Sequence, residues 1–227
     1  MSMQSDIHVT PVRRDIPEGG LLALDTVTLS RRHERMLAAA MRPCGGPAFW
    51  RLRKQREARD FLALAQVCGR LAVHELRLGE AFQAVAYMEV PVPCRPDETG
   101  RLRIAGGALI GLTYREEAVR LPAPGYAFAN ILAPHDVWHA NVGGAEHGQP
   151  ICLGQSMPAA IPLRELVLLI YGALSLQTVM IDERDVAGVM SADAARWWQQ
   201  NLHRIPLTRE PFIRPIEKGP AQEEARP

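Results

Sequence analysis

The residues of this chain that are best suited to chemistry lie together between positions 133 and 158. The stretch has no periodic spacing of apolar residues and is rich in Gly, Pro, His and Asn. It contains His135, His139, Asn141, His147 and Cys152. An irregular segment of this length inside a compact domain is usually functional. A cysteine thiolate is a strong nucleophile, and an amide N–H can stabilise the oxyanion that forms when a carbonyl group is attacked.

Residue types alone leave three interpretations of this stretch open. In the first, Cys152 is a small buried apolar residue and the histidines are ordinary loop residues. In the second, the stretch binds a metal. The proposed ligands are His135, His139 and Cys152, with or without His147. Pro134 and the glycines at 143 and 144 disfavour the helix that would bring an i, i+4 histidine pair together.

In the third interpretation, Cys152 is a nucleophile, and a nearby polar group stabilises an oxyanion. No papain-like or caspase-like signature surrounds any cysteine of the chain. The other cysteines are weaker candidates. Cys68 lies at the expected end of a helix, and Cys44 and Cys94 lie between prolines, with no constellation of polar residues suited to catalysis.

The spacing of apolar residues predicts an α+β fold that would position this stretch. Helices are expected over residues 30–41, 47–67, 162–176 and 191–202, and strands over 71–77, 82–92, 102–114 and 126–132. Arginines at positions 51, 53, 56 and 59 predict a basic outer face on the second helix. A β-bulge is expected at Gly106-Gly107. The chemically interesting stretch therefore connects the last strand to a strongly apolar helix.

The composition is that of a globular chain and excludes several functional classes. The 227 residues are 47% hydrophobic and 22% charged, and a chain of this size buries roughly 70% of its surface on folding. A formal charge of +1 gives no support for binding to nucleic acid or to an anionic membrane. We see no secretory signal and no apolar run long enough to span a bilayer. Four widely spaced cysteines favour reduced thiols in the cytoplasm.

Two short motifs in the irregular stretch occur in an order typical of one family. Residues 139–141 read His-Ala-Asn, and residues 148–153 read Gly-Gln-Pro-Ile-Cys-Leu. This pattern resembles the active-site stretch of ubiquitin-conjugating enzymes, which carry a His-Pro-Asn tripeptide followed by Ile-Cys-Leu with the catalytic cysteine. The proline-rich break at residues 121–124 and the helix at residues 162–176 are also similar to that family. The resemblance covers residues 50–206.

The resemblance implies a UBC-like fold, in which a helix is followed by a four-stranded antiparallel meander, an active-site loop and C-terminal helices. It divides the chain into an N-terminal extension with a possible helix (1–46), a UBC-like catalytic domain (47–206) and a loose C-terminal tail (207–227). It also implies that the helix at 47–67 contacts an activating enzyme. The basic face of this helix would fit an acidic surface on that enzyme.

Carried over residue by residue, the resemblance implies that Cys152 holds a ubiquitin-like protein as a thioester and passes it to an amine. Asn141 would donate to the oxyanion or brace the loop, and Asp185 would orient the incoming lysine. His139 would support the loop by hydrogen bonding. On residue type alone, Asn141 can instead satisfy backbone groups of the loop, and Asp185 can be a solvated acid or a helix cap. The implied partners are a ubiquitin-like protein, an adenylating activating enzyme and an acceptor lysine, with no cofactor or metal.

Three departures from the family pattern are visible. Ala140 replaces the proline of the tripeptide, and Gly154 replaces an acidic residue common in eukaryotic members. The separation between Asn141 and Cys152 is longer than usual, so residues 143–145 are expected to bulge. Such differences resemble bacterial members that are encoded with an activating enzyme, a ubiquitin-like protein and a metalloprotease, some of which act in anti-phage defence. The alternative is a non-catalytic scaffold of the same fold that binds a ubiquitin-like protein or bridges pathway subunits.

Overall fold

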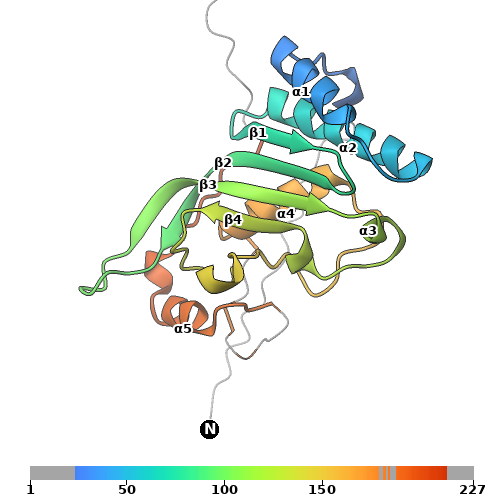
Figure 1. Cartoon of the computed structure of the whole chain (residues 1–227). Helices are drawn as coiled ribbons and strands as arrows, with labels where there is room; N and C mark the ends of the chain where they lie inside the picture. The colour runs from blue at the N-terminus through green and yellow to red at the C-terminus, as the bar shows by residue number, and fades with distance from the viewer. Residues whose placement is uncertain (1–23, 179–180, 183, 185–187, 214–227) are drawn as a thin grey trace, which may run out of the picture.

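The computed structural model describes residues 24–178, 181–182, 184 and 188–213. The elements in chain order are η1 (Leu24–Thr26), α1 (Arg31–Met41), α2 (Ala48–Val67), β1 (Leu71–Arg77), β2 (Phe82–Cys94), β3 (Arg103–Tyr114), α3 (Glu117–Arg120), η2 (Gly125–Ala127), β4 (Ala129–Ala133), η3 (Ala145–His147), α4 (Leu163–Leu174), α5 (Ala192–Gln200) and η4 (Leu202–Arg204). N-terminal helices, an antiparallel sheet and C-terminal helices follow one another, as Figure 1 shows. The predicted α+β order is confirmed. The short helix α3 was not predicted.

The N-terminal helices begin at residues that favour helix starts. The Ser30 hydroxyl accepts a hydrogen bond from the backbone N–H of His33 at 3.3 Å and so caps α1. Pro47 precedes α2, where the fixed φ of proline and its missing N–H do no harm. The intervening Pro43–Pro47 segment cannot continue a helix because it combines two prolines with two glycines.

Residues 24–46 pack against the rest of the described chain. Leu24 and Ala40 belong to the same buried cluster as the sheet and α4. The Arg32 guanidinium donates to the carbonyl oxygen of Val73 on β1 at 3.2 Å. Arg59 of α2 donates to the carbonyl oxygens of residues 24, 25 and 27 at 2.9, 2.8 and 3.2 Å. The described part of the N-terminal extension therefore shares one core with the segment that follows it.

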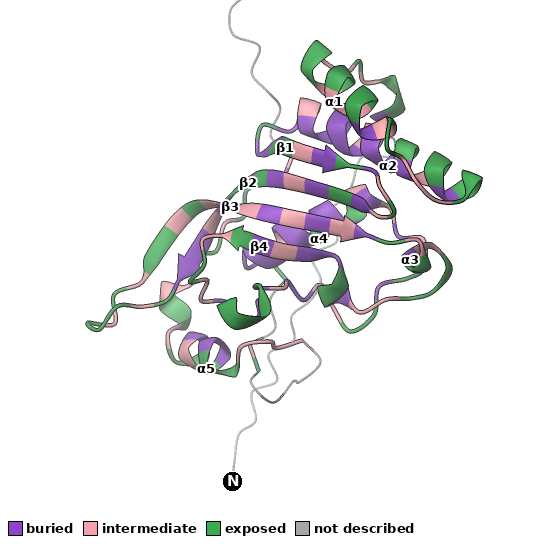
Figure 2. Ribbon diagram, viewed as in Figure 1, coloured by how far each residue is buried: buried purple, intermediate pink, exposed green. Residues whose placement is uncertain are grey.

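The sheet is a meander with strand order β1-β2-β3-β4, and all neighbouring strands are antiparallel. Burial alternates along β2, and Figure 2 shows the same alternation across the sheet. The bulge lies opposite the expected glycines. Glu89 pairs with Gly107 and Val92 with Ala105, so the extra residue is on β2, at Val90-Pro91, rather than on β3. Proline lacks the N–H that a regular ladder would use there.

Helix α4 packs on the inner face of the sheet, against β2 and α2. The apolar stripe predicted to be core is buried throughout, at Leu163, Leu166, Val167, Ile170 and Leu174. Glu57 of α2 accepts a hydrogen bond from the backbone N–H of Leu163 at 2.8 Å. This buried carboxylate therefore lies at the N-terminus of α4, where the helix dipole favours a negative charge.

The fourth strand is shorter than predicted. Residues 125–127 form the turn η2 instead of strand, and β4 covers residues 129–133. Gly125 donates from its backbone N–H to the carbonyl oxygen of Gly154 at 3.0 Å, and a Cβ at Gly125 would lie 2.4 Å from that oxygen. The chain therefore turns here to meet the loop that follows Cys152, and only glycine permits the close approach.

The described part of the expected loose tail, residues 207–213, lies against α4 and the end of α2. Phe212 is only 5% exposed, and its ring centroid is 5.1 Å from that of Tyr171. The Tyr171 hydroxyl donates to the carbonyl oxygen of Glu210 at 2.8 Å. One buried aromatic residue among prolines and charges produces no periodic pattern, so the sequence did not indicate this packing.

Candidate functional site

The stretch that was expected to be irregular extends the sheet beyond β4. The backbone N–H groups of Ile131 and Ile151 donate to the carbonyl oxygens of Gln149 and Ala129, both at 2.9 Å. Segment 150–152 pairs in turn with segment 141–143, because Val142 forms a bridge with Ile151 and Gly143 donates to the carbonyl oxygen of Pro150 at 2.9 Å. These single-residue bridges carry no alternation long enough to be recognised in a sequence.

The pairing places the two motifs of the stretch side by side. The backbone N–H of Cys152 donates to the carbonyl oxygen of Asn141 at 2.8 Å. The connection between the two motifs contains the turn η3 (145–147), which ends at Gly148 with a φ of 75°. Residues 143–145 were expected to bulge; Gly143 is instead paired with Pro150, and Ala145 begins the turn η3.

The side chain of Gln149 holds this stretch together, and the sequence analysis missed it. Its Oε1 accepts the backbone N–H of Val137 at 3.1 Å. Its Nε2 donates to the carbonyl oxygens of Ile131 and Pro134 at 3.1 and 2.7 Å. Gln149 is buried, so its amide satisfies three backbone groups away from water. A glutamine beside a proline has no pattern that would reveal this role.

His139 is buried beneath the loop, and both of its ring nitrogens have partners. Nε2 lies 2.9 Å from the carbonyl oxygen of Ala173 on α4, and Nδ1 accepts the backbone N–H of Asn141 at 3.0 Å. This pairing requires the neutral ring with its proton on Nε2. Desolvation by burial lowers the pKa of His139 to about 4, partly opposed by the hydrogen bond to Ala173. His139 thus links the loop to α4.

The thiol of Cys152 lies in the wall of an open groove of about 410 Å³. The described residues lining the groove come from the loop, from α4 and from the segments that follow it: Asn141, Cys152, Leu153, Gly154, Leu169, Ala173, Gln177, Thr178 and Gly188. Cys152 is 8% exposed, and its Sγ lies 3.8 Å from the carbonyl oxygen of Gly154, to which it donates. The cysteine is therefore largely buried, yet it lies at the surface of a groove.

Asn141 lines the same groove and is 5% exposed. Its Nδ2 donates to the carbonyl oxygen of Gly188 at 2.5 Å. In this state the amide braces the backbone after α4, as one of the two interpretations of Asn141 supposed. Asn141 and Cys152 nevertheless line the same groove, so oxyanion binding by this amide would require that it give up its bond to Gly188.

The other predicted residues are not brought to the groove or lie outside the described residues. Asp185 is one of the residues that the structure leaves undescribed. His135 and His147 are exposed, and the Nε2 of His147 lies 4.0 Å from a carboxylate oxygen of Glu146. Among the described residues, no group of three or more His, Cys, Asp and Glu could hold a metal ion. Both nitrogens of His139 are engaged, which weighs against the metal interpretation.

The remaining cysteines are thiols, with no disulfide among the four. Cys68 and Cys94 are buried, and Cys44 is half-buried outside the groove. Burial of Cys94 raises the pKa of its thiol, with a further contribution from the Asp136 carboxylate. Of the four, Cys152 is the one that lines a groove together with an amide.

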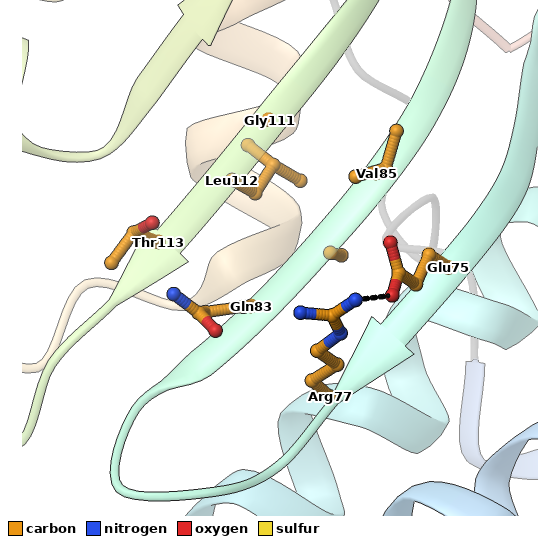
Figure 3. Close-up of a pocket in the computed structure, with 8 residues that line it drawn as sticks. Glu75, Arg77, Gln83, Val85, Gly111, Leu112 and Thr113 are labelled. Atoms are coloured by element: carbon orange, nitrogen blue, oxygen red, sulfur yellow. Dashed lines mark ion pairs between the residues drawn. The ribbon is translucent and has the colours of Figure 1, made fainter.

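Two further hollows lack the features of a reaction site. A cavity of about 500 Å³ on the other side of the loop is lined by Arg95, His135, Asp136, Glu146, Asp193 and their neighbours, with mixed charge and no cysteine. A hollow of about 190 Å³ lies on the outer face of β1, β2 and β3, and Figure 3 shows the residues that line it. There Arg77 forms an ion pair with Glu75, and both side chains are exposed, so the pair contributes little.

No helix in the described ranges is long and apolar enough to cross a membrane. Comparison of the chain with protein-family models, with curated proteins and with solved structures finds no significant match.

Proposed function

We propose that the protein is a ubiquitin-conjugating-like enzyme, a transferase that carries a ubiquitin-like protein as a thioester on Cys152 and transfers it to an acceptor amine. The observation that carries the proposal is that Cys152 and Asn141 line one groove and are joined by a 2.8 Å backbone hydrogen bond. The fold supports it, since a helix, a four-stranded meander, a loop with the cysteine and a long buried helix follow one another as in a UBC-like fold.

The proposed reaction has two steps. The Cys152 thiolate attacks the carbonyl carbon of the modifier's C-terminus, which arrives as a thioester on the activating enzyme. That enzyme's cysteine leaves as a thiolate. An acceptor lysine amine then attacks the new thioester, loses a proton and forms an isopeptide bond, and Cys152 leaves as a thiolate. Cysteine suits both steps because it is a good nucleophile and its thioesters remain reactive toward amines.

The groove supports distinct roles for the neighbouring side chains. Asn141 would exchange its bond to Gly188 for one to the oxyanion during attack. His139 would hold the Asn141 backbone during that exchange, because it binds the Asn141 N–H and α4 together. Asp185 keeps its proposed role in orienting the incoming lysine.

The partners belong to the same proposal. The activating enzyme would meet α2 at Arg51 and Arg56, which are exposed. Arg53 and Arg59 serve the fold instead, because Arg53 pairs with Glu57 at 2.7 Å and Arg59 holds the backbone of η1. A bacterial conjugation pathway, such as one in antiviral defence, is the setting that the departures from the family pattern favour.

Incubation with an activating enzyme, its ubiquitin-like protein and ATP tests the proposal. We expect a covalent adduct that a thiol reductant cleaves, because a thioester exchanges with thiols. Cys152→Ala should abolish the adduct, and Cys152→Ser should replace it with an ester that the reductant leaves intact. Cys44→Ala is the matched control and should charge normally. Charging of Cys152→Ala would contradict the assignment.

Asn141→Ala extends the same assay to the second step. We expect the charged protein to form, and its discharge to a lysine acceptor to slow by roughly a hundredfold, the loss typical of one oxyanion donor. Discharge at the wild-type rate would restrict Asn141 to bracing the loop.

The burial of the site favours a second candidate, a non-catalytic scaffold of the same fold. Cys152 is 8% exposed, and the Asn141 amide is already bound to Gly188. A scaffold would bind the ubiquitin-like protein with equal affinity in the wild type and in Cys152→Ala, as calorimetry would measure, and would form no adduct.

A further inference from the structure

We infer that residues 207–213, named here the C-terminal strap, are a latch on the Cys152 groove, and that release of the strap widens the groove for an incoming chain terminus. The inference concerns regulation of the proposed site, and its biological meaning rests on the proposed function. The contacts that connect the strap, the end of α4 and the groove can be tested without any partner protein.

The strap is attached to the C-terminal end of α4. The backbone N–H of Thr208 donates to the carbonyl oxygen of Ser175 at 3.3 Å. The Tyr171 hydroxyl donates to the carbonyl oxygen of Glu210 at 2.8 Å, and the Phe212 ring packs on the Tyr171 ring. Arg70, which is buried, forms an ion pair with the Glu210 carboxylate.

Gln177 is the residue at which the strap meets the groove. Gln177 lines the groove, and its Nε2 donates to the carbonyl oxygens of Thr208 and Glu210 at 2.9 and 3.5 Å. The backbone of Gln177 and Thr178 is folded back onto α4, because both N–H groups donate to the carbonyl oxygen of Gly172, at 3.0 and 3.1 Å. The backbone of this wall is therefore held by α4, and the strap holds the side chain of Gln177.

Widening of the groove would expose more of the thiol to a chain terminus, since Cys152 and Asn141 are 8% and 5% exposed. Two of the walls are held firmly. Ala173 belongs to the buried face of α4, and the loop wall is paired with β4 on one side and with segment 141–143 on the other. At the third wall Gln177 is exposed, and the strap is what holds its side chain.

The strap buries few side chains of its own, although Phe212 packs in the main core cluster. Phe212 is its one buried side chain, and the other residues of 207–213 are exposed or half-buried. Segments with few buried apolar contacts and exposed hydrogen bonds open locally at a small fraction of the global stability. We expect opening of the strap to leave the sheet and α4 intact.

Cys68 provides an independent reporter for opening of the strap. Its Sγ donates to the carbonyl oxygen of Phe212 at 3.1 Å, and the residue is 1% exposed. Cys68 therefore reacts when the far end of the strap lifts, whereas Cys152 reacts when the groove widens. The reaction rates of the two thiols therefore report separately on lifting of the strap and on widening of the groove.

The test is site-resolved alkylation of the full chain with a bulky maleimide, followed by mass spectrometry. Phe212→Ala should raise the modification rates of both Cys68 and Cys152 by about tenfold or more, because loss of a buried ring greatly weakens local closure. Gln177→Glu removes the donor to the strap. It should raise the Cys152 rate on the order of threefold to tenfold and leave the Cys68 rate unchanged. Gln55→Glu, an exposed change on α2, should alter neither rate.

The inference is overturned if Phe212→Ala accelerates Cys68 alone, or if Gln177→Glu leaves Cys152 unchanged. If Phe212→Ala abolishes cooperative unfolding, Gln177→Glu decides the question alone, since that change is exposed. The assay requires no modifier and no activating enzyme. A protein that never charges but shows the expected alkylation pattern would refute the proposed function and keep the latch.

Discussion

At the scale of single residues, His139 braces the candidate site only while its ring is neutral. The ring donates to α4 through Nε2 and accepts the Asn141 N–H through Nδ1. A second proton on the ring would remove that acceptor and would place a charge in a fully buried position. The geometry of the groove is thus linked to the protonation of one side chain.

Acid should destabilise the protein through His139. Burial lowers the pKa of His139 from 6.5 to about 4, so between these values the unfolded chain binds a proton that the folded chain does not. The contribution of the neutral His139 ring to the free energy of unfolding is fully present above pH 6.5. It is lost as the pH decreases toward 4, and the total loss is about 3 kcal/mol. Denaturant unfolding of the wild type and of His139→Gln at several pH values measures it.

The relevant quantity is the difference in unfolding free energy between the two proteins at each pH, which should shrink as the pH falls. Glu57 has the opposite effect on the pH dependence of stability, because desolvation raises the pKa of its carboxyl from 4.5. Both proteins contain Glu57, so its effect cancels in the difference. His147→Gln, an exposed change, should leave the difference from wild type constant. A constant difference for His139→Gln as well would show that the ring is not buried as described.

At the scale of elements, the position of α4 depends on a carboxylate that belongs to α2. The Glu57 carboxylate accepts the Leu163 N–H at 2.8 Å and pairs with Arg53 at 2.7 Å. Because α4 carries Leu169 and Ala173 of the groove, this contact fixes one wall of the site at a distance from it.

Glu57→Ala should lower the free energy of unfolding by about 2–3 kcal/mol, because it leaves a buried N–H unsatisfied and removes the partner of Arg53. Thermal or denaturant unfolding measures the loss. Glu165→Ala, an exposed change in the first turn of α4, is the control and should cost less than about 1 kcal/mol. Equal losses in the two variants would mean that the contact contributes no more than a surface charge.

At the scale of the whole molecule, the described chain has one main core and a smaller group of buried residues in α5. The core cluster extends from Leu24 to Phe212 and joins α2, the sheet and α4. The buried residues of α5 are outside this cluster among the described residues. Helix α5 is attached by Trp198, whose Nε1 donates to the carbonyl oxygen of Trp138 at 2.9 Å, and by its N-cap Ser191, whose backbone N–H donates to the carbonyl oxygen of Ala140 at 3.1 Å.

We therefore expect α5 to open before the core does. Amide hydrogen exchange should be faster in α5 (192–200) than in α4 (163–174), because α5 buries few apolar groups against the main core. Trp198→Ala should accelerate exchange in α5 and leave α4 unchanged. Equal protection of the two helices in the wild type would show that the chain unfolds as a single unit.

Much of this architecture could be predicted from local pattern. The Ser30 cap, the alternation along β2 and the stripe from Leu163 to Leu174 each depend on residues close in sequence, and each was predicted correctly. The start of β4 was predicted wrongly, because Gly125 is drawn to Gly154, a contact across 29 residues that no local pattern encodes.

The sequence by itself determined the order of the elements and singled out Cys152, Asn141 and His139, because residue type and local periodicity limit backbone conformation and chemistry. Tertiary structure alone decided that the thiol and the amide share a groove, that both His139 nitrogens are engaged, and that Gln149 and Phe212 hold the surrounding segments. These are contacts between distant parts of the chain, and they form only when burial of the core brings the partners within hydrogen-bonding distance.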